Sequence, residues 1–317
     1  MNKKTTIAAI DIGTNSIHMI IANVDDDGNI DLIHRKREVV RLGDSTFGVL
    51  GRLSAESMDK AINTLKKYLS VAIIYKAVVL TCATSAVREA ANGEEFINKI
   101  KDEINLDVQI INGEDEAYLI YSGISKALNL ENHLIMAFDI GGGSTEFIVG
   151  NHKEILFSKS IPIGAVRQSK MFFNDFVLTP QNINQCRNYV KQVLHNEVFE
   201  QINMYKIEKY AGASGTIYST YLMIEKKEAG VYLESINGGI IKSKNLFKLE
   251  NEILSKNTKE ERLNLKGLEN KRADIFPAGI IILSEIFRTF NIEQIVLSTY
   301  AMREGMIINY AKTNKVS

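Results

Sequence analysis

Two turns of similar sequence carry the residues best suited to phosphate chemistry. The first is DIGTNS, in which Asp11 is followed by Thr14, Asn15 and Ser16. The second is DIGGGSTE, which begins at Asp139. Glycines let backbone N–H groups approach an anion closely, and hydroxyl groups add donors. The sequence therefore predicts a phosphate cradle at the first turn and a more open phosphate loop at the second, made of Gly141, Gly142, Gly143, Ser144 and Thr145.

Carboxylates at these turns predict a metal ion. Asp139 and Glu146 lie at the two ends of the second turn, so both carboxylates can reach its open face. Hard cations take oxygen ligands, and Mg²⁺ is the usual cation at phosphate sites. Asp11 is the matching candidate in the first turn, as a partner of the metal or of a water molecule. The alternative is that each turn only closes a tight hairpin, but two copies make coincidence a weaker explanation.

Two further segments predict contacts to an anion. GASGT places Gly212, Ser214, Gly215 and Thr216 where a strand meets the N-terminus of a helix, a common setting for phosphate. ATSAVREA places Arg88 in the first turns of another helix, where its guanidinium could bind phosphate oxygens in pairs. The competing interpretation is that Arg88 pairs with a surface acid near Glu89.

A run of acids follows Gly113, which we expect to end a strand. Glu114, Asp115 and Glu116 then begin a helix. Acidic side chains at a helix N-terminus are ordinarily partners of the helix dipole. In a phosphate cleft, however, one such carboxylate could orient or deprotonate an attacking water molecule.

The elements that position these residues form an internal duplication. Each turn joins two apolar strands, and a third strand, a helix, a fourth strand, a second helix, a fifth strand and a final helix follow it. Ser54 and the Thr179–Pro180 pair predict the starts of the matching helices. The sequence thus predicts an α/β protein of two βββαβαβα units, with the turns of both facing one cleft. A length of 317 residues agrees with two domains of roughly 150 residues.

Composition excludes several classes. The chain is 45% hydrophobic with three prolines, which favours globular domains over disorder. Its formal net charge of zero argues against a nucleic-acid-binding protein. Two cysteines supply neither a disulfide framework nor a zinc site, and no GxxxxGK[ST] loop is present. Apolar runs such as 278–283 are too short to span a membrane. We therefore expect a soluble cytoplasmic protein without a membrane or nucleic-acid partner.

The motifs together resemble a known family. DIGTNSIHM, ATSAVREA, the segment 113–117, DIGGGSTE, GASGT and AMREG are similar, in order and spacing, to those of the exopolyphosphatase and guanosine-pentaphosphate phosphohydrolase (Ppx/GppA) family. The resemblance covers nearly the whole chain. It implies two ribonuclease-H-like domains of the actin and sugar-kinase superfamily, 1–128 and 129–300, facing an interdomain cleft. The helix at about 301–317 would pack back on the first domain. It also suggests a homodimer.

The resemblance also assigns roles to residues. Glu116 matches the family's catalytic glutamate, the base for the attacking water, and Arg88 matches the phosphate-binding arginine. Asp139 and Glu146 match the metal-linked acids, with Mg²⁺ as cofactor and a role for K⁺ left open. The implied reaction is hydrolysis of the terminal phosphoanhydride of inorganic polyphosphate or guanosine pentaphosphate, with release of orthophosphate.

The chain departs from the family pattern at several positions. Asp115 stands where the family usually has Glu, and Tyr118 where it usually has Arg. Thr299 and Tyr300 replace an Asp-Gly pair, and the chain resembles the short, two-domain form. Two other functions stay open. One is an ATP-dependent kinase of the same superfamily, and the other is a noncatalytic phosphate or alarmone sensor. Neither the preferred substrate nor the chain-length preference follows from the sequence.

Overall fold

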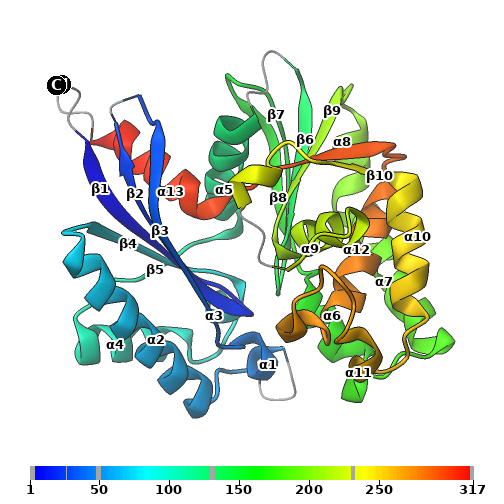
Figure 1. The fold of residues 1–317 in the computed structure, drawn as a ribbon, viewed down its shortest axis with the longest axis horizontal. Coiled ribbons are helices and arrows are strands. Elements are labelled where there is room, and N and C mark those ends of the chain that lie inside the picture. Colours follow the sequence, from blue (N-terminus) through cyan, green and yellow to red (C-terminus); the bar gives the residue numbers. More distant parts are fainter. Residues whose placement is uncertain (1–3, 26, 48–50, 129–132, 230–232, 315–317) are drawn as a thin grey trace. The chain divides into compact units, whose positions relative to one another are not determined.

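The structure is a computed structural model that describes residues 4–25, 27–47, 51–128, 133–229 and 233–314. The chain divides into two compact units (Figure 1). Unit 1 comprises Met1–Gly123 and Tyr300–Ser317, and unit 2 comprises Ile124–Thr299. Within the described residues, no helix is both long enough and apolar enough to cross a membrane.

Unit 1 is built on a five-stranded sheet in the order β3-β2-β1-β4-β5. The first three strands form an antiparallel meander, and β4 and β5 run parallel to β1. The strands are β1 (Thr5–Ile12), β2 (Ser16–Val24), β3 (Ile30–Val39), β4 (Val78–Ala83) and β5 (Gln109–Ile110). The helices are α1 (Gly43–Thr46), α2 (Ala55–Ile74), α3 (Ser85–Arg88), α4 (Gly93–Ile104), α5 (Gly113–Leu128), whose last five residues belong to unit 2, and α13 (Met302–Thr313).

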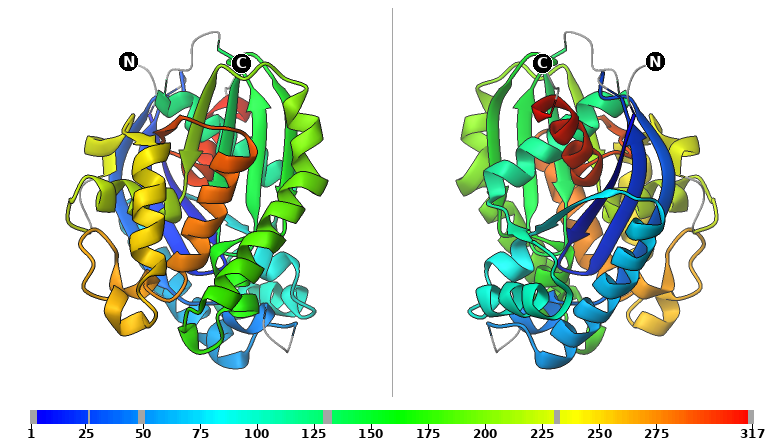
Figure 2. Two further views of the ribbon diagram at one scale, coloured as in Figure 1. Left: turned by 90° about the vertical axis from the view of Figure 1, so that its right-hand side faces the viewer. Right: turned by 90° about the vertical axis from the view of Figure 1, so that its left-hand side faces the viewer.

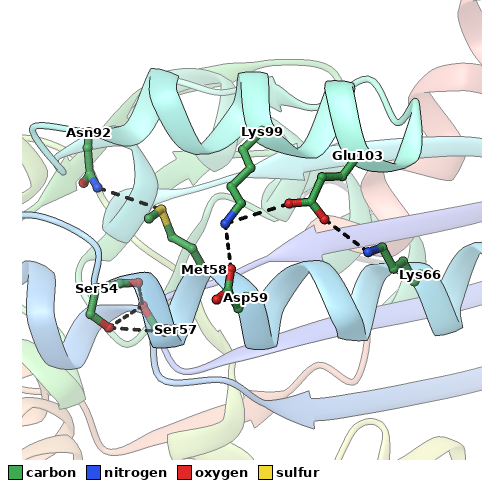
Figure 3. A network of polar contacts seen from close by, with 8 residues as sticks. All are labelled: Ser54, Ser57, Met58, Asp59, Lys66, Asn92, Lys99 and Glu103. Atoms are coloured by element: carbon green, nitrogen blue, oxygen red, sulfur yellow. Dashed lines mark hydrogen bonds and ion pairs between the residues drawn. The ribbon is translucent and has the colours of Figure 1, made fainter.

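Helices α2 and α4 cover one face of this sheet. Their apolar side chains form a buried cluster with alternate residues of β1 and β2, among them Ile10 and Ile17. Ser54 caps α2 as predicted, since its side chain accepts a hydrogen bond from the Ser57 N–H. On the outer side of the two helices, Lys99 of α4 lies 2.6 Å from Asp59 of α2 (Figure 3).

Helix α13 lies against β1, β2 and β3, although it is the last helix of the chain. Its Arg303 Nη1 lies 3.2 Å from His18 Nδ1 on β2, and Glu304 Oε1 lies 3.7 Å from Arg35 Nη2 on β3. These contacts bring the AMREG motif to the strand that follows the first turn.

Unit 2 is built on a six-stranded sheet in the order β10-β11-β9-β6-β7-β8. Its strands are β6 (Ile135–Ile140), β7 (Thr145–Gly150), β8 (Ile155–Ile161), β9 (Lys209–Ala213), β10 (Ile240–Lys242) and β11 (Gln294–Leu297). Its helices are α6 (Ala165–Phe172), α7 (Pro180–Leu194), α8 (Glu200–Asn203), α9 (Gly215–Ile224), α10 (Ser243–Leu254), α11 (Lys259–Arg262) and α12 (Phe276–Thr289). A π-helical turn (His195–Phe199) joins α7 to α8, and short 3₁₀ turns lie at Asn174–Phe176, Leu233–Ile236 and Asn270–Arg272.

Helices α7, α10 and α12 pack side by side in unit 2 (Figure 2). The segment from Phe276 to Phe287 of α12 is buried throughout, and most of its side chains belong to the hydrophobic core of unit 2. Thr179 caps α7 through a reciprocal pair of hydrogen bonds with Asn182, and Pro180 occupies the first turn, as predicted.

The two sheets confirm the duplication. The order β3-β2-β1-β4-β5 of unit 1 recurs as β8-β7-β6-β9-β11 in unit 2. In both units the first two pairs of this order are antiparallel and the last two are parallel. Unit 2 adds β10, antiparallel to β11, at one edge. This arrangement is ribonuclease-H-like, as predicted. One local prediction is wrong: Gly113 does not end a strand but opens α5, because β5 already ends at Ile110.

Candidate active site

The two predicted phosphate turns have the same backbone design. In unit 2, Gly141 N donates to Ser144 O at 2.9 Å, and in unit 1, Gly13 N donates to Ser16 O at 3.2 Å. Carbonyl groups inside both turns are then held by the segment that follows the third strand. Asn15 O accepts from Val40 N and Arg41 N in unit 1, and Gly142 O accepts from Val166 N and Arg167 N in unit 2.

This design directs carbonyl groups back into the protein and leaves amide groups for a ligand. Within the described residues, the N–H groups of Thr14 and Asn15 have no acceptor, and neither do those of Gly142 and Gly143. Successive amides with no protein acceptor form a site for an oxyanion. The geometry therefore supports phosphate binding at both turns.

A close backbone contact fixes the glycine-rich turn against α6. A Cβ atom added at Gly164, the N-cap of α6, would lie 2.5 Å from both the carbonyl carbon and the carbonyl oxygen of Gly142. Arg167, on the first turn of α6, donates from Nε to Gly143 O at 2.6 Å. The start of α6 thus holds Gly142 and Gly143 in place.

Asp139 and Glu146 face each other across the strand pair. They are direct partners in the antiparallel register of β6 and β7, so their side chains lie on the same face of the sheet. Glu146 is 1% exposed, and its Oε1 accepts from Ser144 Oγ at 2.6 Å and from Ser160 Oγ at 2.7 Å. These two hydroxyl groups orient the carboxylate without neutralising it.

This carboxylate pair fits Mg²⁺. Magnesium is commonly held by one or two carboxylates together with water molecules and substrate phosphates, rather than by a complete protein cage. Among the residues that the structure describes, no group of three or more His, Cys, Asp or Glu side chains forms a preformed metal cage. Asp139 and Glu146 are the residues that would hold the ion.

The two hydroxyl side chains of the glycine-rich turn are differently placed. Ser144 donates to Glu146, as described above, whereas Thr145 Oγ1 donates to Ile163 O at 2.6 Å. Thr145 is fully buried. Its hydroxyl group therefore donates a hydrogen bond within the core of unit 2 and stabilises the turn.

GASGT forms the strand-to-helix junction predicted from the sequence. Ser214 adopts φ 115° and ψ 164°, a conformation that is rare for residues other than glycine, and its side chain caps α9. The register places Ala213 beside Asp139 in the parallel β6–β9 pair. Strain of this kind is characteristic of binding loops, which is consistent with a ligand at this end of the sheet.

Arg272 adds a cation to this junction. A Cβ atom added at Gly215 would lie 2.3 Å from Arg272 Nη1, and Arg272 Nη2 donates to Thr216 Oγ1 at 3.3 Å. Gly215 therefore makes room for the guanidinium group. The sequence did not predict a role for Arg272, since it lies 56 residues from Thr216 and outside the GASGT motif.

In unit 1, the first turn contacts the segment that carries Arg88. Thr14 Oγ1 and Ser85 Oγ are 2.9 Å apart and buried, and Thr84 N donates to Ile12 O. Ser16 is also buried, and its Oγ accepts from Asn15 Nδ2 at 3.2 Å. The hydroxyl groups of Thr14 and Ser16 thus form hydrogen bonds that stabilise the turn. The backbone N–H groups of Thr14 and Asn15 take no part in these bonds.

Arg88 and Glu116 form the central ion pair of unit 1. Arg88 Nη1 donates to Glu116 Oε2 at 2.9 Å and to Ile111 O at 2.8 Å. The Glu116 side chain is 10% exposed, whereas Glu114 and Asp115 of the same helical turn are exposed. Arg88 therefore pairs with Glu116 and not with an acid near Glu89. Within the described residues, its Nε and Nη2 make no hydrogen bond and can contact a phosphate.

The field of the acids is visible at Cys82. This residue lies beside Asp11 in the β1–β4 register. Burial, followed by the negative charges of Asp11 and Glu116, raises the pKa of its thiol to about 12. The position of Asp11 beside Cys82, near the end of β4, places it at the end of the sheet from which the chain continues to Arg88, the partner of Glu116.

The residues that depart from the family pattern lie around these elements. Asp115 N donates to Asn112 Oδ1, which caps α5, while Tyr118 is 43% exposed. Thr299 donates from N and Oγ1 to Asn237 Oδ1. The structure thus gives Thr299 a packing role at the end of β11.

A cavity of about 620 Å³ lies elsewhere in unit 2. Its lining includes Lys209 and Gln294, at the starts of β9 and β11, whereas GASGT spans the end of β9 and the start of α9. It therefore lies at the other end of the sheet from the proposed phosphate site.

Comparison with known proteins agrees with this geometry. Residues 20–314 match the model of the Ppx/GppA phosphatase family. A protein of Fusobacterium nucleatum subsp. nucleatum, named bifunctional 3-dehydroquinate synthase/phosphatase, is 34% identical over 314 residues. The match covers 95% of this chain but only 46% of that relative, so this chain spans about half of its length.

Two crystal structures extend the comparison. An exopolyphosphatase from Cytophaga hutchinsonii superposes with a TM-score of 0.89 and 31% identity, covering 98% of this chain and 99% of that one. A member of the Ppx/GppA protein family from Aquifex aeolicus superposes with a TM-score of 0.82 and 25% identity, covering 99% and 100% of the two chains.

Proposed function

Because the chain belongs to the Ppx/GppA phosphatase family and is thus a hydrolase of phosphoric anhydrides, we propose that it removes the terminal phosphate of inorganic polyphosphate, with Glu116 as base. The observation that carries this assignment is the Arg88–Glu116 pair. One guanidinium nitrogen of Arg88 holds the carboxylate, and the other two remain for phosphate oxygens. A phosphate bound by Arg88 would therefore lie next to Glu116.

The proposed reaction is direct attack of water. A water molecule held by Glu116 forms a bond to the terminal phosphorus and transfers its proton to the carboxylate. The bridging P–O bond breaks, and its electron pair leaves with the shortened polyphosphate chain. Arg88 and the amides of the first turn would stabilise the charge on the phosphoryl oxygens, which is the main contribution to catalysis of phosphoryl transfer.

Mg²⁺ is the proposed cofactor. Bound at Asp139 and Glu146, it would neutralise charge on the phosphate oxygens. Ser144 and Ser160 fix the orientation of the Glu146 carboxylate by donating hydrogen bonds to its Oε1. A contribution of K⁺, a homodimer and a cytoplasmic location stay predictions.

Glu116→Gln tests the proposal, with Glu114→Gln as its matched control. Both residues lie in the first turn of α5, but Glu114 is exposed and Glu116 is buried. We expect Glu116→Gln to lower kcat for phosphate release from polyphosphate by about 10²–10⁴-fold, since that is the usual contribution of a general base. Glu114→Gln should leave kcat within about twofold. Equal activity of the two variants would exclude Glu116 as the base.

The substrate arms of the same assay separate the alternatives. Guanosine pentaphosphate is the second proposed substrate, and its hydrolysis relative to polyphosphate would name the preferred one. Tyr118 and Thr299 are the residues that keep a sensor function open. Binding of either compound by the wild-type protein without phosphate release would favour the sensor. Formation of ADP from added ATP, or a need for an acceptor, would favour a kinase.

A further inference from the structure

The segment between β5 and α5 is bonded to both members of the Arg88–Glu116 pair. Arg88 Nη1 donates to Glu116 Oε2 at 2.9 Å and to Ile111 O at 2.8 Å. Ile111 N donates in turn to the carbonyl oxygen of Ala83, the last residue of β4, at 3.1 Å. The backbone of Ile111 is therefore fixed at both its N–H and its carbonyl group, and one nitrogen of Arg88 joins it to the carboxylate.

Asn112, the next residue, closes the first turn of α5. Its Oδ1 accepts from Asp115 N at 2.8 Å, and its backbone O accepts from Glu116 N at 3.0 Å. An Asn side chain that accepts from an N–H three residues later is an N-cap, which satisfies a donor that the helix itself leaves without a partner. Asn112 thus holds the backbone of both Asp115 and Glu116.

These bonds form a closed ring of contacts. The ring runs from Arg88 through the segment 111–112 to Glu116, whose carboxylate returns to Arg88. The two acceptors of Arg88 Nη1 lie five residues apart in the sequence, so a single nitrogen can bond to both only when the intervening turn is closed. Helix ends tend to fray, and a frayed turn would carry the Glu116 carboxylate away from Arg88.

The other residues of this turn do little to keep it closed. Gly113 begins α5, and glycine is the weakest helix former after proline. Glu114 and Asp115 are exposed, so packing does not hold their side chains. Their charges favour the N-terminus of a helix, but an attraction between charge and dipole does not fix the position of one atom. The Asn112 cap therefore supplies the geometric constraint.

The second copy of the fold is built without such a cap. Its matching helix is α13, which also follows the last parallel strand of a sheet and begins after Ala301, whose side chain makes no capping hydrogen bond. There, Ala301 N donates to Glu304 Oε2 at 3.0 Å instead. The duplicated fold thus does not require a polar side chain at this junction, and the cap occurs on the helix that carries Glu116.

We propose that Asn112 is a positioning residue, whose side chain keeps the first turn of α5 closed and thereby holds the Glu116 carboxylate beside Arg88. The inference rests on the proposed function, because it assigns the residue that positions the proposed base. Asn112 is exposed, whereas Glu116 is 7% exposed. Truncation of Asn112 therefore removes the cap without opening a cavity in the core.

Asn112→Ala tests the proposal, together with the conservative variant Asn112→Ser. We expect Asn112→Ala to lower kcat for phosphate release from polyphosphate at least about tenfold and to change KM less than about twofold, since a misplaced base acts on the chemical step. Serine is also a good N-cap, so Asn112→Ser should keep kcat within about threefold of the wild-type value. An unchanged kcat in Asn112→Ala, or an equal loss in Asn112→Ser, would overturn the positioning role.

Ser54→Ala is the control for a lost cap. Ser54 accepts from Ser57 N at the start of α2, in the same unit (Figure 3). Each alanine variant loses one N-cap, so both should unfold at similarly lowered urea concentrations. Ser54→Ala should nevertheless leave kcat within about twofold of the wild-type value. An equal fall of kcat in this control would show that lost stability alone explains the effect, which would overturn the proposal.

A double-mutant cycle shows whether Asn112 acts through Glu116. If it does, the Asn112→Ala/Glu116→Gln variant should have the same kcat as Glu116→Gln alone. A further loss in the double variant would show that Asn112 acts on another group, and the assigned role would then be wrong.

Crystal structures of the variants keep this inference separate from the proposed function. We expect Glu116 Oε2 to lie beyond hydrogen-bond distance of Arg88 Nη1 in Asn112→Ala and within it in Asn112→Ser. That result supports the positioning role even if the wild-type protein releases no phosphate, an outcome that would overturn the proposed function alone. An Arg88–Glu116 pair that is unchanged in Asn112→Ala overturns the positioning role even if hydrolysis is observed.

Discussion

At the residue scale, Ser144 and Thr145 show how neighbouring hydroxyl groups differ in role. Both were predicted from the sequence to bind phosphate, because both follow three glycines. The antiparallel strand that begins at Thr145 turns successive side chains to opposite faces, so Ser144 reaches Glu146 while Thr145 reaches Ile163 O. A motif gives the type of side chain, but the alternation of the strand decides which one faces the ligand.

Thr145→Val tests this division. The substitution keeps the shape of the side chain but leaves the buried Ile163 carbonyl without its 2.6 Å hydrogen bond. We expect the free energy of unfolding to fall by about 1–3 kcal/mol, the cost of an unsatisfied buried polar group. The measurement is urea denaturation, together with KM for polyphosphate. A tenfold rise in KM without loss of stability would instead show that the Thr145 hydroxyl binds substrate.

Cys82 provides a pH-dependent prediction. Its pKa is raised to about 12, so at pH 8 only about 10⁻⁴ of the thiol is the reactive thiolate. Burial raises the pKa of Cys186, the other cysteine, to about 12 as well. We expect iodoacetamide at pH 8 to leave the native protein unmodified over an hour and to add two labels in urea, as read by intact-protein mass spectrometry.

The raised pKa of Cys82 also makes the stability of the protein depend on pH. The folded state keeps the Cys82 proton up to about pH 12, whereas the unfolded thiol releases it near 9.0. The contribution to stability is therefore complete below pH 9 and is lost as the pH rises through this interval. Rapid labelling of native Cys82 at pH 8 would contradict the buried position beside Asp11.

At the element scale, the caps were predictable because they depend on neighbouring residues. Ser54 and Thr179 each bond to an N–H three residues away, so the local sequence is sufficient. Gly113 misled the prediction, since a glycine commonly ends an element but here it opens α5. The contacts of Ser160 and Arg272 could not be predicted in this way, because their partners lie 14 and 56 residues away in the sequence. Only the folded unit brings these residues together.

A buried ion-pair network ties three helices of unit 2 together. Glu250 of α10 is fully buried and lies 2.8 Å from Arg187 Nη2 of α7 and 2.6 Å from Arg288 Nη2 of α12. Glu285 of α12 contacts both arginines as well. Arg288 is exposed, but the Arg187 side chain is only 26% exposed, so loss of Glu250 leaves charge at Arg187 that water cannot fully solvate.

Glu250→Gln should therefore lower the free energy of unfolding by about 3 kcal/mol, at the lower end of the range for a broken buried ion pair. Glu228→Gln is the matched control. Glu228 lies 3.1 Å from Lys266, but both side chains are more than half exposed, and we expect no measurable change. Urea denaturation, followed by far-ultraviolet circular dichroism because the chain has no tryptophan, measures both variants. Equal midpoints for the two would show that the α7–α10–α12 network contributes nothing to stability.

At the scale of the whole molecule, the duplication preserves the backbone of the turns but changes the chemistry around them. In unit 2, Asp139 faces Glu146 across the strand pair. In unit 1, the corresponding Asp11 faces His18, which contacts Arg303 of α13. One turn therefore combines two carboxylates, and the other combines a carboxylate with basic side chains. This difference predicts that binding of the divalent cation depends mainly on residues of unit 2.

Magnesium titration of three variants tests that asymmetry. We expect Asp139→Asn and Glu146→Gln to raise the Mg²⁺ concentration for half-maximal hydrolysis at least about tenfold, since changes within or next to a metal's ligand shell typically cost 10–100-fold in affinity. Asp11→Asn should raise it by less, because its strand partner His18 cannot act as a second carboxylate. Direct binding of Mn²⁺, followed by electron paramagnetic resonance, gives a readout independent of turnover. A larger loss of Mn²⁺ affinity in Asp11→Asn than in Asp139→Asn would place the cation with unit 1, and the preserved turn of unit 2 would then serve the phosphate alone.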